Sequence, residues 1–105
     1  MTTPDQLELQ HTLLTATARY DALRVREMLG DAADLPLTRE ETLELLALSE
    51  VIVRKAAYGR HLSVRSARES GASWAQIGAS LGTSRQAAQE AHDRWLDERR
   101  DSGGI

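Results

Sequence analysis

The chain has 105 residues, with 13 basic and 16 acidic side chains, a formal net charge of -3 and an apolar fraction of 41 %. This length supports one compact domain, or a small domain with one protruding element, and the composition lies well outside the disordered range. Cysteine is absent, which excludes a disulfide framework and a thiolate metal site. We expect a cytoplasmic protein, because no apolar run approaches the roughly 18 residues of a membrane span and no signal-peptide pattern is present.

The net charge conceals an asymmetry between the two halves of the chain. Residues 1–50 carry four basic and ten acidic side chains, whereas residues 51–105 carry nine basic and six acidic ones. Between Val51 and Gln89, six basic residues accompany a single acidic one, Glu69. A basic stretch inside an acidic protein is typical of a site for a polyanion, although a solvated helix face has the same composition.

Apolar residues at helical spacing predict a first helix that begins at Pro4-Asp5 and continues to Leu29. Gly30 follows as a C-terminal cap, and residues 31–36 have the composition of a loop.

A second, longer helix is predicted from Arg39 to about Ser70. It begins with a capping box, in which the side chains of Thr38 and Glu41 bond each other's backbone N–H groups. No proline interrupts it, so we favour one continuous helix, with a break at Gly59 as the alternative.

Apolar residues lie on more than one face of this long helix. One stripe, expected to pack against the first helix, contains Leu43, Leu46, Ala47, Glu50, Val53, Ala57, His61 and Val64. Leu45, Leu48 and Ile52 point away from that stripe. A surplus apolar face in a small chain favours pairing with a second copy, so we expect a homodimer with these three residues at its interface. The alternative is that the first helix covers more of the second.

The segment after residue 70 carries the functional prediction. Gly71 ends the long helix, and Ser73 is placed as the N-cap of a two-turn helix. Gly82 supplies the positive φ of a sharp turn, and Ser84 caps another helix. Two short helices joined by a Gly-centred turn are typical of the helix-turn-helix unit.

The segment Ser73-Trp74-Ala75-Gln76-Ile77-Gly78-Ala79-Ser80-Leu81-Gly82-Thr83-Ser84-Arg85-Gln86-Ala87-Ala88 resembles the helix-turn-helix of bacterial transcription regulators. It is similar in particular to small regulators with the signature SWxxIGxxLGxSRQA. The resemblance covers about a quarter of the chain, from Gly71 to Trp95, and does not place the first 70 residues.

The fold prediction combines this resemblance with the two long helices. We expect an all-α protein in which residues 1–70 form an antiparallel helix hairpin that dimerises. Residues 71–100 form the helix-turn-helix unit, and residues 101–105 form a disordered tail. The expected core of that unit consists of Trp74, Ile77, Gly78, Leu81, Gly82, Ala88, Ala91 and Trp95. Within it, Ile77 and Leu81 are the buried residues of the first short helix, and Gly78 lies where the two helices approach most closely.

The opposite face of the second short helix is polar. The resemblance implies that this face enters the major groove of double-stranded DNA, with base contacts from Arg85, Gln86, Gln89 and Glu90. Candidates for phosphate contacts are Ser73, Thr83, Ser84, Arg65 and Arg68. Asp93 and Asp97 make the later turns acidic, so groove entry is limited to the N-terminal turns, or else the unit binds a protein.

The sequence therefore predicts a small dimeric transcription regulator that binds double-stranded DNA sequence-specifically through the major groove. The alternatives are a DNA-binding protein of plasmid or chromosome segregation and a helix-turn-helix adaptor for a protein partner. His11, His61 and His92 lie far apart in the sequence, and no catalytic or cofactor motif is found. We therefore expect no enzymatic activity, metal or cofactor, and as partners DNA and a second copy, but no membrane.

Overall fold

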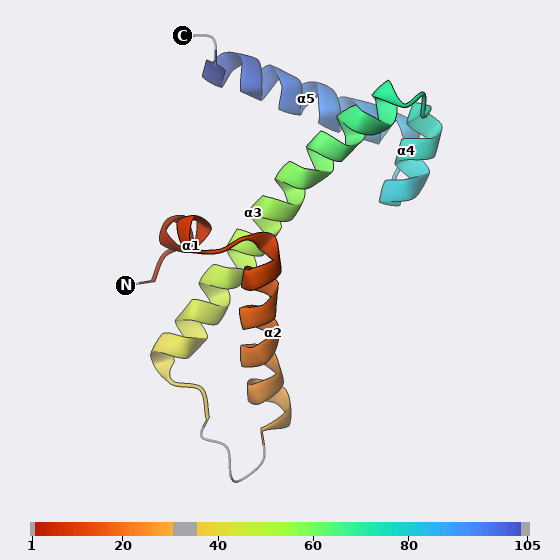
Figure 1. Ribbon diagram of the computed structural model, residues 1–105. Coiled ribbons are helices and arrows are strands. Elements are labelled where there is room, and N and C mark those ends of the chain that lie inside the picture. Colours follow the sequence, from red (N-terminus) through yellow and green to blue (C-terminus); the bar gives the residue numbers. More distant parts are fainter. Residues whose placement is uncertain (1, 31–35, 104–105) are drawn as a thin grey trace. The chain divides into compact units, whose positions relative to one another are not determined.

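The structure, a computed structural model, describes residues 2–30 and 36–103. Five helices and no strand occur within these residues (Figure 1): α1 (Pro4–Gln10), α2 (Leu13–Leu29), α3 (Arg39–Glu69), α4 (Trp74–Leu81) and α5 (Arg85–Gly103). The predicted all-α class is thus confirmed. None of the described helices has the length and hydropathy that crossing a membrane requires. The chain divides into two compact parts, the N-terminal unit (Met1–Ala57) and the C-terminal unit (Tyr58–Ile105).

The first residues form two helices where the sequence pattern predicted one. α1 ends at Gln10, and Thr12 caps α2 by accepting a hydrogen bond from the Thr15 N–H at 3.2 Å. In return the Thr12 N–H donates to the Thr15 hydroxyl oxygen at 3.0 Å. This capping box begins a new helix inside the apolar stripe, so the prediction of a single helix is wrong. Its signal was weak because threonine replaces the usual Glu or Gln at the third position. Gly30 caps the end of α2 as predicted.

The long helix α3 begins and ends close to the predicted residues. The Thr38 N–H donates to Glu41 Oε1 at 3.0 Å, and the Glu41 N–H donates to Thr38 Oγ1 at 3.0 Å, which confirms the capping box. The helix continues through Gly59, so the alternative break is absent there. Of the loop expected at 31–36, residues 31–35 lie outside the described part of the chain.

Within the N-terminal unit, α2 lies antiparallel beside α3 (Figure 1). Arg19 donates two hydrogen bonds of 2.9 Å to the carboxylate of Glu44. Arg26 donates two of 2.8 Å to that of Glu41. Arg26 lies later in α2 than Arg19, and its partner Glu41 lies earlier in α3 than Glu44, as an antiparallel pair of helices requires. The expected hairpin is therefore present in this unit.

The core of the N-terminal unit is aliphatic and contains Leu7, Ala16, Leu23, Leu45, Ala47, Leu48 and Val51, with Tyr20, Leu37 and Ile52 packed against it. Leu45 and Leu48 are 4 % and 0 % exposed. Because Leu45 and Leu48 are buried inside one chain, the expectation that they form a dimer interface is wrong for these two residues, whereas Ile52 is half-buried. In contrast, Leu46 and Val53, expected inside, are 63 % and 62 % exposed.

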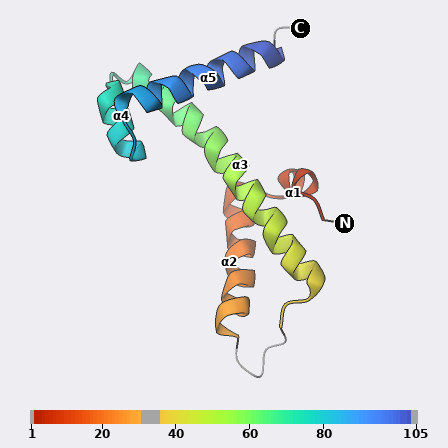
Figure 2. The same cartoon turned by 180° about the vertical axis from the view of Figure 1, so that it is seen from behind.

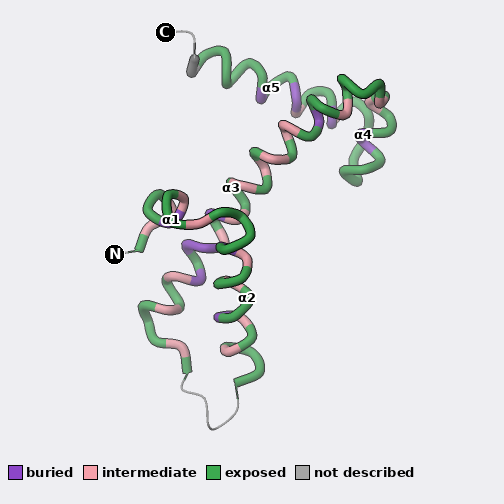
Figure 3. Tube along the Cα trace, viewed as in Figure 1, coloured by how far each residue is buried: buried purple, intermediate pink, exposed green. Residues whose placement is uncertain are grey.

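The position of α1 explains which face of α3 is buried. Arg54 of α3 pairs with Asp5 at 3.0 Å and with Glu8 at 3.2 Å, and Lys55 Nζ donates to the Glu8 carbonyl at 3.3 Å. These bonds hold α1 against α3 and place Leu7 in the core. Many of the buried residues consequently gather where α1, α2 and α3 meet (Figure 3). Of the stripe that was assigned to the core, Leu43, Leu46 and Val53 remain exposed, whereas Ala47 and Val64 are buried as expected.

In the C-terminal unit, α4 and the first turns of α5 lie beside the last turns of α3 (Figure 2). α5 continues to Gly103. The expected disordered tail is therefore wrong for residues 101–103, and residues 104–105 lie outside the described part. An ion pair of 3.8 Å between Asp97 and Arg100 supports these last turns, because residues three apart are neighbours on a helix.

Candidate functional site

The link between α3 and α4 is a capped turn. Gly71 ends α3 with a left-handed φ of 94°, and its N–H donates to the Arg68 carbonyl at 3.0 Å. Ser73 then caps α4, since its Oγ accepts the Gln76 N–H at 3.1 Å. Gln76 Oε1 accepts the Ser73 N–H at 2.9 Å and completes a capping box. The predicted N-cap at Ser73 is confirmed, and the role of Gln76 was not predicted.

The turn between α4 and α5 is tightly packed. Gly82 has a left-handed φ of 71°, and the Thr83 N–H donates to the Gly78 carbonyl at 2.8 Å. A Cβ atom on Gly78 would lie only 2.9 Å from backbone atoms of Thr83 and Ser84. Ser84 Oγ accepts the Ala87 N–H at 3.0 Å and caps α5. The close approach predicted at Gly78 is confirmed, although the chain that it meets is the turn and not the middle of α5.

The core beneath this turn consists of Val64, Ile77 and Ala88, with Ala67, Ala72 and Trp74 packed against it. Trp95 is also buried, and Ala91 is half-buried. Leu81 is 40 % exposed, so its expected place in the core is wrong. As the last residue of α4, it lies one turn beyond Ile77 and lines an open groove of about 390 Å³ between α3 and α4.

Two histidines join the two tryptophans in one cluster. The rings of His61 and Trp95 are stacked with centroids 4.9 Å apart. His92 lies 5.6 Å from Trp74 and 5.7 Å from Trp95. His92 is buried, and its Nδ1 has no hydrogen-bond partner among the described residues. This cluster was not predicted, although His92 follows Ala88 by four residues and precedes Trp95 by three, which is the spacing of the core face.

Burial lowers the pKa of His61 below its ordinary value, and the nearby His92 and Arg60 lower it further. Folding therefore favours the neutral imidazole of His61, in the ring that stacks on Trp95. The histidines do not form a metal centre with other ligands, since within the described residues no group of three or more His, Asp or Glu side chains lies close enough to hold a metal ion.

The four predicted base-contact residues, Arg85, Gln86, Gln89 and Glu90, are all exposed on the first two turns of α5. Gln86 Nε2 donates to Glu90 Oε1 at 3.0 Å, so these two side chains share a face. In the described part of the chain, Arg85 and Gln89 make no side-chain hydrogen bond or ion pair and remain available to a ligand.

The predicted phosphate-contact residues differ in how many bonds their side chains already make within the protein. Thr83 is exposed, and the Ser73 and Ser84 hydroxyls accept capping bonds while keeping a hydrogen to donate. Arg68 is occupied, because it donates to the Ala72 carbonyl at 2.9 Å and its guanidinium lies 5.0 Å from the centre of the Trp74 ring.

Arg65 is the better candidate of the two arginines. It is exposed on α3, and among the described residues no hydrogen bond or ion pair restrains its guanidinium. Arg68 holds the end of α3 against α4, so its replacement would alter the fold as well as the charge.

Comparison with known proteins gives no further assignment. No protein-family model matches the chain, and no match was found among curated proteins or among solved structures.

Proposed function

We propose that residues 71–100 form a helix-turn-helix unit and that the protein is a small dimeric transcription regulator that binds double-stranded DNA. The observation that carries the proposal is the packing of α4, the Gly82 turn and α5. Contact of Gly78 with the turn backbone and burial of Ile77 and Ala88 fix α5 against α4. The same packing leaves the polar side chains of the first two turns of α5 exposed.

These exposed turns carry side chains that suit the edges of base pairs in the major groove. The guanidinium of Arg85 can donate two hydrogen bonds to guanine O6 and N7, and the amide of Gln89 can pair with adenine N6 and N7. The carboxylate of Glu90 can accept a hydrogen bond from cytosine N4, and its contact with Gln86 orients it for this. Such contacts would read sequence directly.

Two further features favour an anionic partner. The N-terminus of α5, capped by Ser84, presents the positive end of the helix dipole. The exposed Arg65 can bind a phosphate without losing a bond inside the protein. Asp93 and Asp97 are exposed further along α5, so the N-terminal turns would enter the groove and the later turns would tilt away from the backbone.

The test is selection of bound sequences from a random duplex pool at roughly physiological salt. We expect enrichment of a palindrome with half-sites about 10 base pairs apart, because a two-fold dimer presents two recognition helices. Absence of any enriched sequence would overturn the proposal. Binding to many clustered copies, in place of a single operator, would indicate a segregation protein.

Two variants separate base reading from phosphate binding. Arg85→Ala should lose about 1–3 kcal/mol on the selected duplex and relax the preference at one base pair. Arg65→Ala should weaken all duplexes alike and reduce the slope of log affinity against log salt by about one unit. Arg39→Ala removes the same charge from the N-terminal unit and should leave the sequence preference unchanged. Unaltered specific binding by Arg85→Ala would exclude α5 as the recognition helix.

A second candidate function is favoured by one observation, the exposed acidic groups Glu90, Asp93 and Asp97 on α5. In this case the unit is an adaptor that binds a basic surface of a protein partner. The adaptor would show no salt-sensitive affinity for DNA, so the binding experiments above also decide between the two functions.

A further inference from the structure

The outer face of α2 carries a largely apolar stripe. It consists of Leu14, Ala18, Asp21, Val25 and Met28, all of them exposed, and successive members are separated alternately by four and three residues. Leu14 is 77 % exposed, Val25 50 % and Met28 70 %. An alternating spacing of four and three is the seam pattern by which one helix packs along another. Within the described chain no helix covers this α2 stripe.

α3 carries a matching stripe beside it, with Thr42, Leu46, Ser49, Val53 and Ala56 at the same alternating spacing. None of these residues is charged, and Leu46 and Val53 are 63 % and 62 % exposed. This α3 stripe contains residues that the sequence pattern had assigned to the core.

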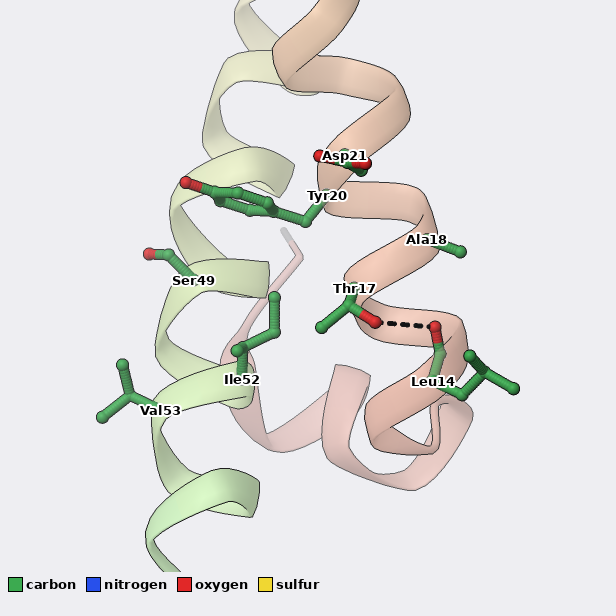
Figure 4. Close-up of a pocket in the computed structure, with 8 residues that line it drawn as sticks. All are labelled: Leu14, Thr17, Ala18, Tyr20, Asp21, Ser49, Ile52 and Val53. Carbon is green, nitrogen blue, oxygen red and sulfur yellow. Dashed lines mark hydrogen bonds between the residues drawn. The ribbon is translucent and has the colours of Figure 1, made fainter. Parts of the chain in front are cut away.

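A groove of about 610 Å³ runs between the two stripes and lies wholly within the N-terminal unit. Its lining includes Leu14, Asp21 and Val53 of the stripes. Figure 4 shows Thr17, Tyr20 and Ile52 between the two helices, with Leu14 and Ala18 on the outer side of α2 and Val53 on the outer side of α3. The hairpin therefore presents two ridges and a groove, the surface that a second hairpin packs against in a four-helix bundle.

We propose that this face binds the same face of a second copy of the chain, so that two hairpins form a four-helix bundle. The inference deepens the proposed function, because a regulator of a palindromic site needs a dimer. A two-fold dimer uses one patch twice, and a patch with matching ridges and a groove is complementary to itself.

The exposed large side chains supply a substantial part of the area that such an interface needs. Leu14, Val25, Met28, Leu46 and Val53 together leave about 300 Å² of apolar surface exposed per chain, taking about 100 Å² for a whole aliphatic side chain. Two copies would bury about 600 Å² from these residues alone, roughly half of the smallest stable interfaces, and the small residues of the stripes and the groove floor would add to this area.

The charges around the face favour a second copy over a membrane surface. Binding to an anionic membrane requires free basic residues beside the apolar face. Arg19 of α2 is instead bound to Glu44 inside the hairpin, and Arg24 is bound to Glu27 and the Tyr20 hydroxyl. Asp21 is the single charged residue of the two stripes.

Asp21 also selects between two arrangements of the bundle. Packing α2 on its own copy in antiparallel fashion would place Asp21 against Asp21 of the partner subunit and repel. A two-fold axis along the helices places α2 against α3 of the partner subunit. Asp21 and Ser49 line the same groove, so Asp21 would then face the uncharged α3 stripe of the partner subunit, which offers hydroxyl donors. The second arrangement is the one we infer.

The mass in solution tests the interface, measured by sedimentation equilibrium alongside circular dichroism. We expect twice the chain mass of 11.6 kDa for the wild type, and monomers with unchanged helicity for Val25→Glu and Leu46→Glu. Leu9→Glu is the matched control, because Leu9 is 91 % exposed on α1 and outside the face, and it should stay dimeric. A monomeric wild type at about 100 μM, or folded glutamate variants that remain dimers, would overturn the proposal.

Single cysteines test the arrangement, since the natural chain has none. A mixture of Asp21→Cys and Ser49→Cys chains should form the mixed disulfide on oxidation. A disulfide between two Asp21→Cys chains in its place would overturn the inferred arrangement.

Duplex selection keeps this inference separate from the proposed function. A wild-type dimer that selects no DNA sequence would overturn the regulator and leave the interface standing. A monomeric wild type that still selects a single half-site would overturn the interface and leave sequence-specific DNA binding standing.

Discussion

The two units of the molecule differ in how they use arginine. In the N-terminal unit four arginines form ion pairs with carboxylates: Arg19, Arg24, Arg26 and Arg54. In the C-terminal unit Arg68 and Arg99 lie over tryptophan rings, and Arg65 and Arg85 have no bonded partner among the described residues. Most arginines of the N-terminal unit are thus paired within the fold, whereas Arg65 and Arg85 of the C-terminal unit stay available to an anionic ligand although Arg100 pairs with Asp97. This difference explains why the C-terminal part of the basic stretch between Val51 and Gln89 is a better candidate for binding an anion than the arginines of the N-terminal unit.

The cores differ as well, and the difference makes the units separately observable. The N-terminal core is aliphatic, whereas both tryptophans of the chain, Trp74 and Trp95, pack with histidines in the C-terminal unit. Tryptophan fluorescence therefore reports on the C-terminal unit alone, and far-UV circular dichroism reports on the helices of both.

The largest effect is expected from the N-terminal core. Leu48→Ala should lower the free energy of unfolding of this unit by about 3 kcal/mol, because Leu48 is 0 % exposed and its truncation leaves a cavity. Denaturant unfolding followed by circular dichroism measures the loss. Leu46→Ala, two residues away and 63 % exposed, should change the stability of the monomer by less than about 0.5 kcal/mol. Equal losses in the two variants would mean that the buried face of α3 is assigned wrongly.

Gly78→Val should destabilise the C-terminal unit by about 1–3 kcal/mol, seen as an earlier fluorescence transition. The added side chain would meet the backbone of Thr83 and Ser84, with its Cβ at 2.9 Å, and backbone yields less readily than a side chain. Gly59→Ala is the control within α3, where a Cβ has no neighbour within 4 Å. That substitution should stabilise the helix by up to about 1 kcal/mol. A neutral Gly78→Val would show that α4 and the turn are loosely packed.

Local structure could be predicted from the sequence because its determinants lie within a few residues of each other. The Thr38–Glu41 capping box, the Ser73 and Ser84 caps and the left-handed Gly82 all follow from such short-range chemistry. The resemblance rests on the same segment. The break at Thr12 is the exception, since the second member of its capping box is a threonine.

Packing between helices could not be predicted in the same way. α3 is apolar on several faces, and the choice of Leu45 and Leu48 for the core depends on where α1 and α2 lie. Leu81 had the right spacing for burial, but its helix ends there. His92 was judged by its distance in sequence from His61, whereas both rings contact Trp95. In each case the periodicity predicts which residues share one face of a helix. Whether that face is buried depends on the position of the neighbouring helices.

Acid should weaken the C-terminal unit first. The pKa of His61 is lowered in the fold, by burial first and then by His92 and Arg60, while Glu98 opposes the shift. Between the ordinary value of 6.5 and the lower folded pKa, the unfolded chain binds a proton that the folded chain does not. The stability associated with the neutral His61 ring is therefore fully present above pH 6.5. It is lost as the pH falls through the lower pKa of His61 in the folded state. The fluorescence transition should shift to lower denaturant between about pH 7.5 and 5.5.

His61→Phe keeps a ring against Trp95 and removes the titration, so it should reduce this shift. His11→Gln removes a histidine from the N-terminal unit and should leave the fluorescence shift unchanged. A pH dependence that is identical in wild type and His61→Phe would place its origin outside His61.

The smallest effect is expected in the N-terminal unit at lower pH. Hydrogen bonds from Arg26, and then from the Thr38 backbone, lower the pKa of Glu41 from 4.5 to about 2. A carboxyl with a lowered folded pKa stabilises the fold above its unfolded pKa, and this contribution is lost as the pH falls from 4.5 to about 2. Solvent screens the ion pair, because both side chains are partly exposed, so the change should be small. Circular dichroism would follow it.

Glu41→Gln isolates this contribution, because glutamine keeps an oxygen that can cap Thr38 but has no charge to titrate. The variant should lose part of the acid dependence of the N-terminal unit and keep its helix start. The two units should therefore lose stability in sequence on acidification, the C-terminal one near the histidine range and the N-terminal one near the carboxyl range. If Glu41→Gln retained the full acid dependence, the Arg26–Glu41 ion pair would contribute nothing measurable to the free energy of unfolding. The ion pairs of this unit would then neutralise the arginine charge without stabilising the fold.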